Sequence, residues 1–382
     1  WVVLAIFLAA LVATCNALSS AQLAAAHPKS GGTYEYGYEF LSPSLGFVAG
    51  GMFLLAKSAS AATAALGFAG YFLHLLGLEL IPNQLIALPT LIVMTLLILG
   101  GIKRSSQVNM TIVSVTIFSL LSLSIAGLWY YMTRPAPIPE SSMHQSFSFG
   151  NLFHATALMF VAYTGYGRVA TLAEEVQNPK RTIPKAIIAT LLVSFLVYFL
   201  VSTSSILSAG SELLSQATEI SSAPLQAVAE TTGPSLLVIL VTIGAMTAML
   251  GVLLNLILGL SRIYLAMGRR KDLPERFAHV SSTTHSPTNA ILITSIVIGL
   301  LVLIGDVTIT WSVSAFTVLI YYSITNAAAL ALPEQKRLFP RWIAWSGLTA
   351  CLFLAFVIEW QITITGISLV ILLILIHKLK GG

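Results

Sequence analysis

Charged side chains are scarce in this chain of 382 residues. They make up 9% of it, against roughly 25% in soluble domains. Hydrophobic residues account for 57%, and the mean hydropathy is +0.90. This composition excludes an ordinary soluble domain, and nearly the whole chain is expected to lie in lipid.

Cysteine and the signatures of catalysis are scarce as well. Cys15 and Cys351 are the two cysteines. Both fall within apolar runs, which predicts buried thiols without a disulfide framework or a metal site. The seven histidines show no ligand spacing, and the chain has no HExxH, GxSxG or phosphate-loop motif. We therefore expect neither an enzyme nor a bound metal or cofactor.

Apolar runs long enough to cross a bilayer, about 17 to 25 residues each, recur along the whole chain. They predict an all-α polytopic membrane protein with a single transmembrane domain over residues 1–382. Eleven spans are expected, near residues 3–26, 44–73, 85–101, 107–131, 151–173, 186–208, 236–266, 288–305, 309–332, 342–359 and 361–377.

Basic residues gather in the connections on one side of these spans. Fifteen lysines and arginines lie there, whereas the opposite connections hold only Arg134. The positive-inside rule makes the basic side and the C-terminus cytoplasmic. The net charge of +5 is thus expected to meet anionic lipid headgroups and not nucleic acid.

The fifth span interrupts its own helical pattern at Ala162-Tyr163-Thr164-Gly165-Tyr166-Gly167, called the predicted seat below. Loosened backbone at membrane depth survives only where it lines a cavity or is covered by protein. Secondary transporters use such discontinuous helices to hold a substrate near the bilayer midplane. The alternative is a glycine pair that lets a neighbouring helix approach closely.

Three separated motifs support the first interpretation. Pro28 precedes Gly31-Gly32 after the first span, and Ser261-Arg262 is followed by Leu273-Pro274. The third motif follows the predicted seat and reads Glu174-Glu175-Val176-Gln177-Asn178-Pro179-Lys180-Arg181. In this order the motifs resemble the amino acid-polyamine-organocation (APC) transporter family over about residues 1–340. The resemblance implies a LeuT-like five-plus-five inverted-repeat bundle, alternating access, and amino acids or related amines as substrates.

The chain also departs from the family pattern. Its spans correspond to family helices 2 to 12, without the glycine-rich first helix. An odd span count and a first residue other than Met favour an earlier helix that is absent from the given sequence, with processing of a short leader as the alternative. Gly167 and Gln22 stand where relatives place acids, and Thr116 stands where some proton-coupled members have lysine.

Lys57 lies near the middle of its span, where a cation costs at least about 2.5 to 3.5 kcal/mol. No carboxylate is expected at similar depth. Because burial disfavours a charged lysine, Lys57 could carry a coupling proton or meet a substrate carboxylate. Alternatively, it extends along a cavity wall toward water. Arg168 could steer a carboxylate or bond the carbonyls of the inner half-helix.

Other polar positions have simpler interpretations. Asn255 and Asn326 are expected to make helix-to-helix hydrogen bonds. A short helix is expected within residues 209–234 on the outer side. Glu174, Glu175, Lys180 and Arg181 could pair with the basic loop at 269–276 as an inner gate, or form a solvated loop.

The sequence thus predicts a secondary transporter of the plasma (inner) membrane that carries small amino acids, with a neutral or acidic substrate favoured over a cationic one. Protons are the expected coupling ion in symport, with exchange as an alternative, and membrane lipids surround the protein. Two rival hypotheses remain, a polyamine or amine transporter of the same fold and a non-transporting scaffold or sensor derived from a transporter. The oligomeric state does not follow from the sequence.

Overall fold

The computed structural model describes residues 1–29, 31–78, 80–100, 105–134, 148–167, 178–281 and 286–379. This described part is helical and contains no strand. Seven of its helices are long and apolar enough to span a membrane, and three shorter apolar helices accompany them. The predicted all-α polytopic class is confirmed.

The first half of the bundle follows the predicted spans closely. It comprises α1 (Val2–Ala26), α2 (Thr33–Phe40), α3 (Pro43–Leu75), α4 (Gln84–Leu99) and α5 (Ser105–Thr133). Ser42 caps α3 by accepting from the Leu45 backbone N–H, and Pro43 occupies the first helical position, where proline is favoured. Helix α2 was not predicted and lies in the first basic connection.

The second half begins with α7 (Phe149–Tyr163) and the 3₁₀ helix η1 (Thr164–Tyr166). The remaining elements are α9 (Pro179–Ile220), α10 (Pro224–Thr232), α11 (Ser235–Arg269), η3 (Glu275–Ala278), α12 (Thr288–Val302), α13 (Val307–Ala331), η4 (Glu334–Lys336), α14 (Arg341–Ala355) and α15 (Trp360–Leu379). The short helix predicted within residues 209–234 is confirmed as α10, and its location on the outer side stays a prediction. Helix α9 runs beyond the predicted end of its span, through a kink at Gly210.

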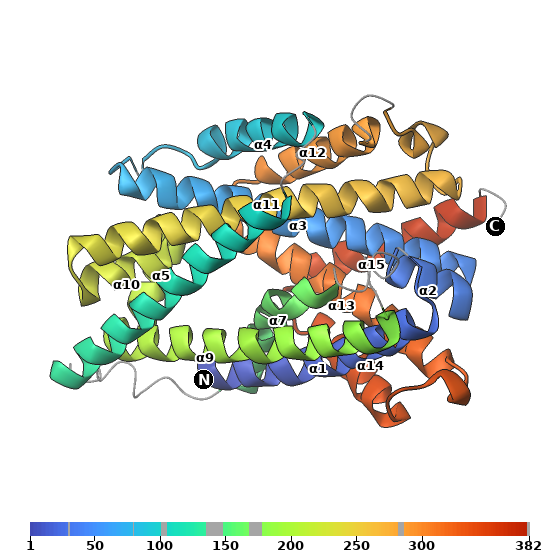
Figure 1. Ribbon diagram of the computed structural model, residues 1–382, viewed down its shortest axis with the longest axis horizontal. Coiled ribbons are helices and arrows are strands. Elements are labelled where there is room, and N and C mark those ends of the chain that lie inside the picture. Colours follow the sequence, from blue (N-terminus) through green and yellow to red (C-terminus); the bar gives the residue numbers. More distant parts are fainter. Residues whose placement is uncertain are drawn as a thin grey trace.

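The packing relates two sets of elements, α1 to α5 and α9 to α13. Helix α1 packs on α9, α3 packs on α11, and α4 packs on α12. The contact of α3 with α13 corresponds to the contact of α11 with α5. Helix α2 packs against α3 and α13, and α10 against α11 and α5. Because α2 and α10 lie at opposite ends of the bundle (Figure 1), the second set is inverted relative to the first.

Helix α7 packs against α1, α13 and α14, so that η1 lies inside the bundle. One core cluster surrounds it and includes Phe160, Tyr166, Phe316 and Tyr322, all almost fully buried. A second cluster joins α3, α4, α11 and α12. The candidate site lies between these two clusters.

Candidate functional site

Helix α7 changes from α-helical to 3₁₀ geometry inside the predicted seat. Thr164 caps the end of α7, and its hydroxyl donates to the Val161 carbonyl at 2.7 Å. The Ala162 carbonyl accepts from the Tyr198 hydroxyl at 2.9 Å. Glycine weakens a helix by about 1 kcal/mol relative to alanine, so Gly165 and Gly167 favour a change of geometry at this point. Protein groups therefore satisfy part of the backbone that the change releases.

A cavity of about 280 Å³ lies beside η1, between α3 and α11. Its volume is close to the lower end of small-molecule pockets, roughly 300 Å³. Its walls consist of Phe53 and Lys57 from α3, Thr164 and Gly165 from η1, and Val252, Asn255, Leu256, Gly259 and Leu260 from α11. We call it the Lys57 cavity.

The ammonium of Lys57 is the cationic group of this cavity. Its Nζ donates to the Thr164 hydroxyl oxygen at 2.9 Å. Thr164 is its one hydrogen-bond acceptor within the described part of the chain, and no carboxylate is among the lining residues. The lysine ammonium has three donors, so it can also donate to an anionic or carbonyl oxygen of a bound ligand.

The two glycines of the predicted seat have different surroundings. A Cβ on Gly165 would meet no atom within 4 Å, and the same holds for Gly259 across the cavity. A Cβ on Gly167 would come within 2.7 Å of the Tyr322 hydroxyl. Gly165 thus borders open space, whereas Gly167 permits close approach to α13.

The other predicted seat residues face away from the Lys57 cavity. Ala162 and Tyr163 line a second cavity of about 250 Å³ with Ile6 of α1 and Tyr198 of α9. Tyr163 donates to the Ile6 carbonyl at 3.4 Å. Tyr166 is buried against the ring of Tyr322, with centroids 5.5 Å apart. The structure therefore brings Thr164 and Gly165, out of the six, to Lys57.

The remaining predicted site residues do not line this cavity or are not described. Thr116 is half-buried on α5 and donates to the Ile112 carbonyl of its own helix at 2.8 Å. Arg168, Glu174 and Glu175 lie outside the described residues, as does the side chain of Lys180. Arg181 is exposed at the start of α9. The gate and coupling roles of these residues stay predictions.

The basic loop after α11 has partners in α2. Arg270 Nη2 donates to both carboxylate oxygens of Glu35, at 2.8 Å to Oε1 and 2.6 Å to Oε2, and the guanidinium lies over the Tyr38 ring. The hydroxyls of Tyr34 and Tyr38 both donate to Asp272 Oδ2, at 2.5 and 2.7 Å. Burial, together with these hydrogen bonds, raises the pKa of both tyrosines above the ordinary value. Both therefore stay protonated as donors at neutral pH.

The α11 wall of the cavity was not identified as a site from the sequence. Val252, Asn255, Leu256 and Gly259 follow the i, i+3, i+4, i+7 spacing of one helix face, and that spacing could have grouped them. Asn326, by contrast, makes the predicted interhelix bond, with its Nδ2 donating to Asn16 Oδ1 of α1 at 2.5 Å. Asn326 thus makes an interhelix hydrogen bond as predicted, whereas Asn255 is also part of the cavity wall.

Comparison with known proteins identifies the family. Residues 1–376 match the family model described as amino acid permease. The chain belongs to this family. The predicted relation to APC transporters is therefore confirmed, and the protein is a transporter and not an enzyme.

Individual relatives agree with this assignment. The permease is 37% identical over 355 residues to the uncharacterized transporter Rv1999c of Mycobacterium tuberculosis, covering 92% of this chain and 77% of that one. It is 29% identical to the branched-chain amino acid permease BcaP of Bacillus subtilis, covering 73% and 62%. Identity to the cationic amino acid transporter 7, chloroplastic, of Arabidopsis thaliana is 25%, covering 96% and 65%. The chain thus spans less than two thirds of the last two relatives.

Proposed function

We propose that this permease is a secondary active transporter that moves amino acids across the plasma membrane by alternating access. The observation that carries the proposal is the Lys57 cavity, which is lined by both a lysine ammonium and the loosened backbone of η1. Discontinuous helices of this kind hold substrates in secondary transporters. The basic connections and the C-terminus are cytoplasmic in this proposal.

The charge of the cavity favours a neutral amino acid over a cationic one. Lys57 can pair with the substrate carboxylate, whereas a cationic side chain would add a second positive charge without a carboxylate on the lining. Phe53, Val252 and Leu256 offer apolar walls for an aliphatic side chain. Substrates named for the relatives include both branched-chain and cationic amino acids, and the lining of this cavity supports the former class.

Lys57 is also the proposed proton carrier. Loss of its proton removes the energetic cost of a cation at membrane depth, and rebinding restores the partner for a carboxylate. Substrate binding and protonation would then be linked through one side chain. This arrangement suits proton-coupled symport, with exchange as the alternative mode.

Uptake by purified protein in proteoliposomes tests the proposal. We expect accumulation of a labelled neutral amino acid when an inward proton gradient is imposed, with little accumulation of a cationic one. Lys57→Met should abolish the response to the gradient, whereas Lys29→Met, in the loop after α1, should leave it intact. Uptake that ignores the gradient and survives Lys57→Met would refute coupling through this lysine.

A further inference from the structure

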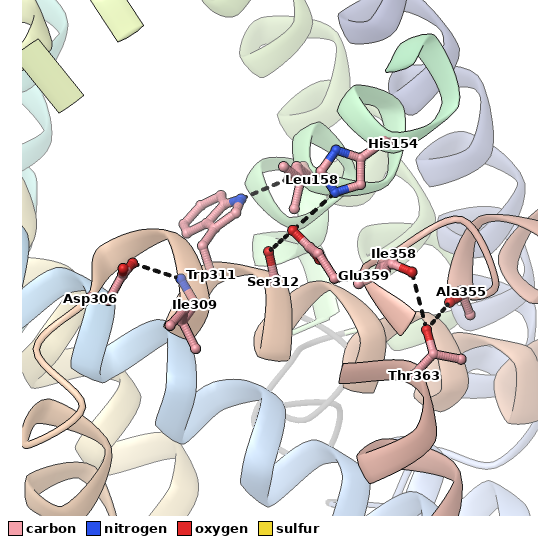
Figure 2. A network of polar contacts seen from close by, with 10 residues as sticks. All are labelled: His154, Leu158, Asp306, Ile309, Trp311, Ser312, Ala355, Ile358, Glu359 and Thr363. Carbon is pink, nitrogen blue, oxygen red and sulfur yellow. Dashed lines mark hydrogen bonds and ion pairs between the residues drawn. The ribbon is translucent and has the colours of Figure 1, made fainter. Parts of the chain in front are cut away.

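A polar network at the outer half of α7 is separate from the Lys57 cavity. His154 Nε2 lies 3.2 Å from Glu359 Oε1, and the Ser312 hydroxyl donates to the same oxygen at 3.2 Å. Trp311 Nε1 donates to the Leu158 carbonyl at 2.9 Å. Figure 2 shows the imidazole and the hydroxyl converging on this one carboxylate from α7 and α13.

The network connects the helix that carries the candidate site to two other elements. His154 and Leu158 are on α7, ten and six residues before Thr164. Trp311 and Ser312 are in the first turns of α13, and Glu359 directly precedes α15. The position of α7, and hence of η1, therefore depends on contacts made at this end.

Two features of Glu359 show that its negative charge is only partly compensated. Its second oxygen, Oε2, is buried, and no group in the described residues donates a hydrogen bond to it. Its first oxygen already accepts from Ser312 and faces the histidine. A half-satisfied carboxylate beside an imidazole gains most from a positive charge on the imidazole, since charge-assisted hydrogen bonds are about twice as strong as neutral ones.

Within the described residues, the helices around this pair carry few other charged side chains. Helix α1, which packs on α7, contains no charged residue, and neither does α13 within its helical span. Asp306 instead caps α13, accepting from the Ile309 N–H. Arg341 begins α14 and lies at the far end of that helix from Glu359. Within the described residues, His154 and Glu359 are therefore the titratable pair of this network.

We propose that His154 and Glu359 form a proton-binding site, filled from the outer solution, that fixes α7 against α13 and α15. Both side chains are about one third exposed, and the first turns of α7 face the outer solution in the proposed topology, so a proton can arrive from that side. The proton binds to the free imidazole nitrogen of His154, and the resulting cation pairs with the carboxylate. When the proton leaves, the pair reverts to a neutral imidazole beside an uncompensated carboxylate, and the tie to α7 weakens.

Histidine is the side chain whose charge ordinarily changes between pH 5 and 8. Acidification from pH 8.5 to 5.5 should therefore tighten the contact. The permease offers a matched control, because His74 at the end of α3 lies 3.3 Å from Glu230 of α10. That second histidine–glutamate pair lies outside α7.

Distance measurement between spin labels tests the proposal without any need for transport. We would label Asn151→Cys and Gln361→Cys, two exposed positions on either side of the pair, in nanodiscs with Cys15→Ala. Cys351 is fully buried and can stay. We expect a narrow distance distribution at pH 5.5 and a broader one at pH 8.5.

Variants then assign the response. His154→Gln keeps a hydrogen-bond donor but cannot change its charge, and Glu359→Gln removes the negative charge. In each variant, the distance distribution at pH 5.5 should therefore equal that at pH 8.5. Ser312→Ala and His74→Gln keep the pair and should retain the shift. The proposal is overturned if the parent shows no shift, if either pair variant keeps it, or if His74→Gln abolishes it. Because no substrate is present, these outcomes stand apart from those of the uptake assay.

Discussion

The two sides of η1 differ in packing, although the residues that form them are neighbours in the chain. On one side, Gly165 and Thr164 border the Lys57 cavity. On the other, Tyr166 and Gly167 pack against Tyr322, with the aromatic rings in contact and no space for a Cβ. A short 3₁₀ segment thus presents a hollow wall to α3 and α11 and a filled wall to α13.

Two glycines in one motif thus satisfy different requirements. The packing interpretation drawn from the sequence describes Gly167, whereas a ligand seat at Thr164 and Gly165 stays a proposal. Gly167 permits a close helix contact of the kind small residues allow in membranes. Gly165 leaves volume beside η1, the 3₁₀ segment that follows α7.

The largest expected difference between the walls is in stability. Gly167→Ala forces a Cβ to within 2.7 Å of the buried Tyr322 hydroxyl and should lower the free energy of unfolding by about 2 kcal/mol. Gly165→Ala meets no atom, so stability should stay equal or rise by about 0.5 kcal/mol. Thermal unfolding of both variants in detergent checks this, and equal losses would contradict the distinction.

Filling the hollow wall should reduce transport more than stability. Gly259→Val adds bulk to the Lys57 cavity from α11 and should lower the apparent affinity for the transported amino acid about tenfold, or about 1.4 kcal/mol. Gly299→Val is the control, because Gly299 lies on α12 against Leu91 at ordinary contact distance. Uptake kinetics on both variants measure the effect, and similar losses would argue against a site in this cavity.

Removal of the Thr164 hydroxyl should have a smaller effect. Thr164→Val deletes the acceptor of the Lys57 ammonium and should change apparent affinity by about 1 kcal/mol, or about fivefold. Thr116→Val removes a hydroxyl that bonds within its own helix and should leave uptake kinetics unchanged. A stronger effect at Thr116 would favour the coupling role that the family resemblance suggested.

The smallest effect tests the filled wall by double substitution. Tyr322→Phe removes the hydroxyl that a Cβ at position 167 would strike. In the Gly167→Ala background it should restore about 0.5 to 1 kcal/mol of stability, measured as the coupling energy of a double-mutant cycle. A coupling energy of zero would mean that Gly167→Ala destabilises through something other than this contact.

Much of this architecture could be predicted because lipid imposes strict rules on sequence. Span positions follow from apolar length, and the break in α7 follows from Gly165 and Gly167 within an apolar run. Helix α2 escaped prediction because its eight residues are held by tertiary contacts, such as Tyr34 to Asp272, and not by an apolar period. The end of α9 was missed because its last turns continue past Gly210 as polar helix.

The site was only partly predictable for a related reason. Lys57 could be placed by depth alone, since a cation in mid-span is expensive. The neighbours of Lys57 are set by how α3, η1 and α11 pack together, and a single sequence does not give the distances between these elements. For the same reason, the sequence could not show that Thr164 contacts Lys57 while Tyr163 and Tyr166 contact other residues.

Substrate protection of a cysteine in the Lys57 cavity tests whether the transported amino acid binds there. With Cys15→Ala as background, Gly259→Cys should react with a small thiol reagent, and a saturating neutral amino acid should slow that reaction. Gly299→Cys, outside the cavity, should react at the same rate with or without substrate. If uptake proceeds but the amino acid leaves the reaction rate of Gly259→Cys unchanged, the substrate binds outside the Lys57 cavity.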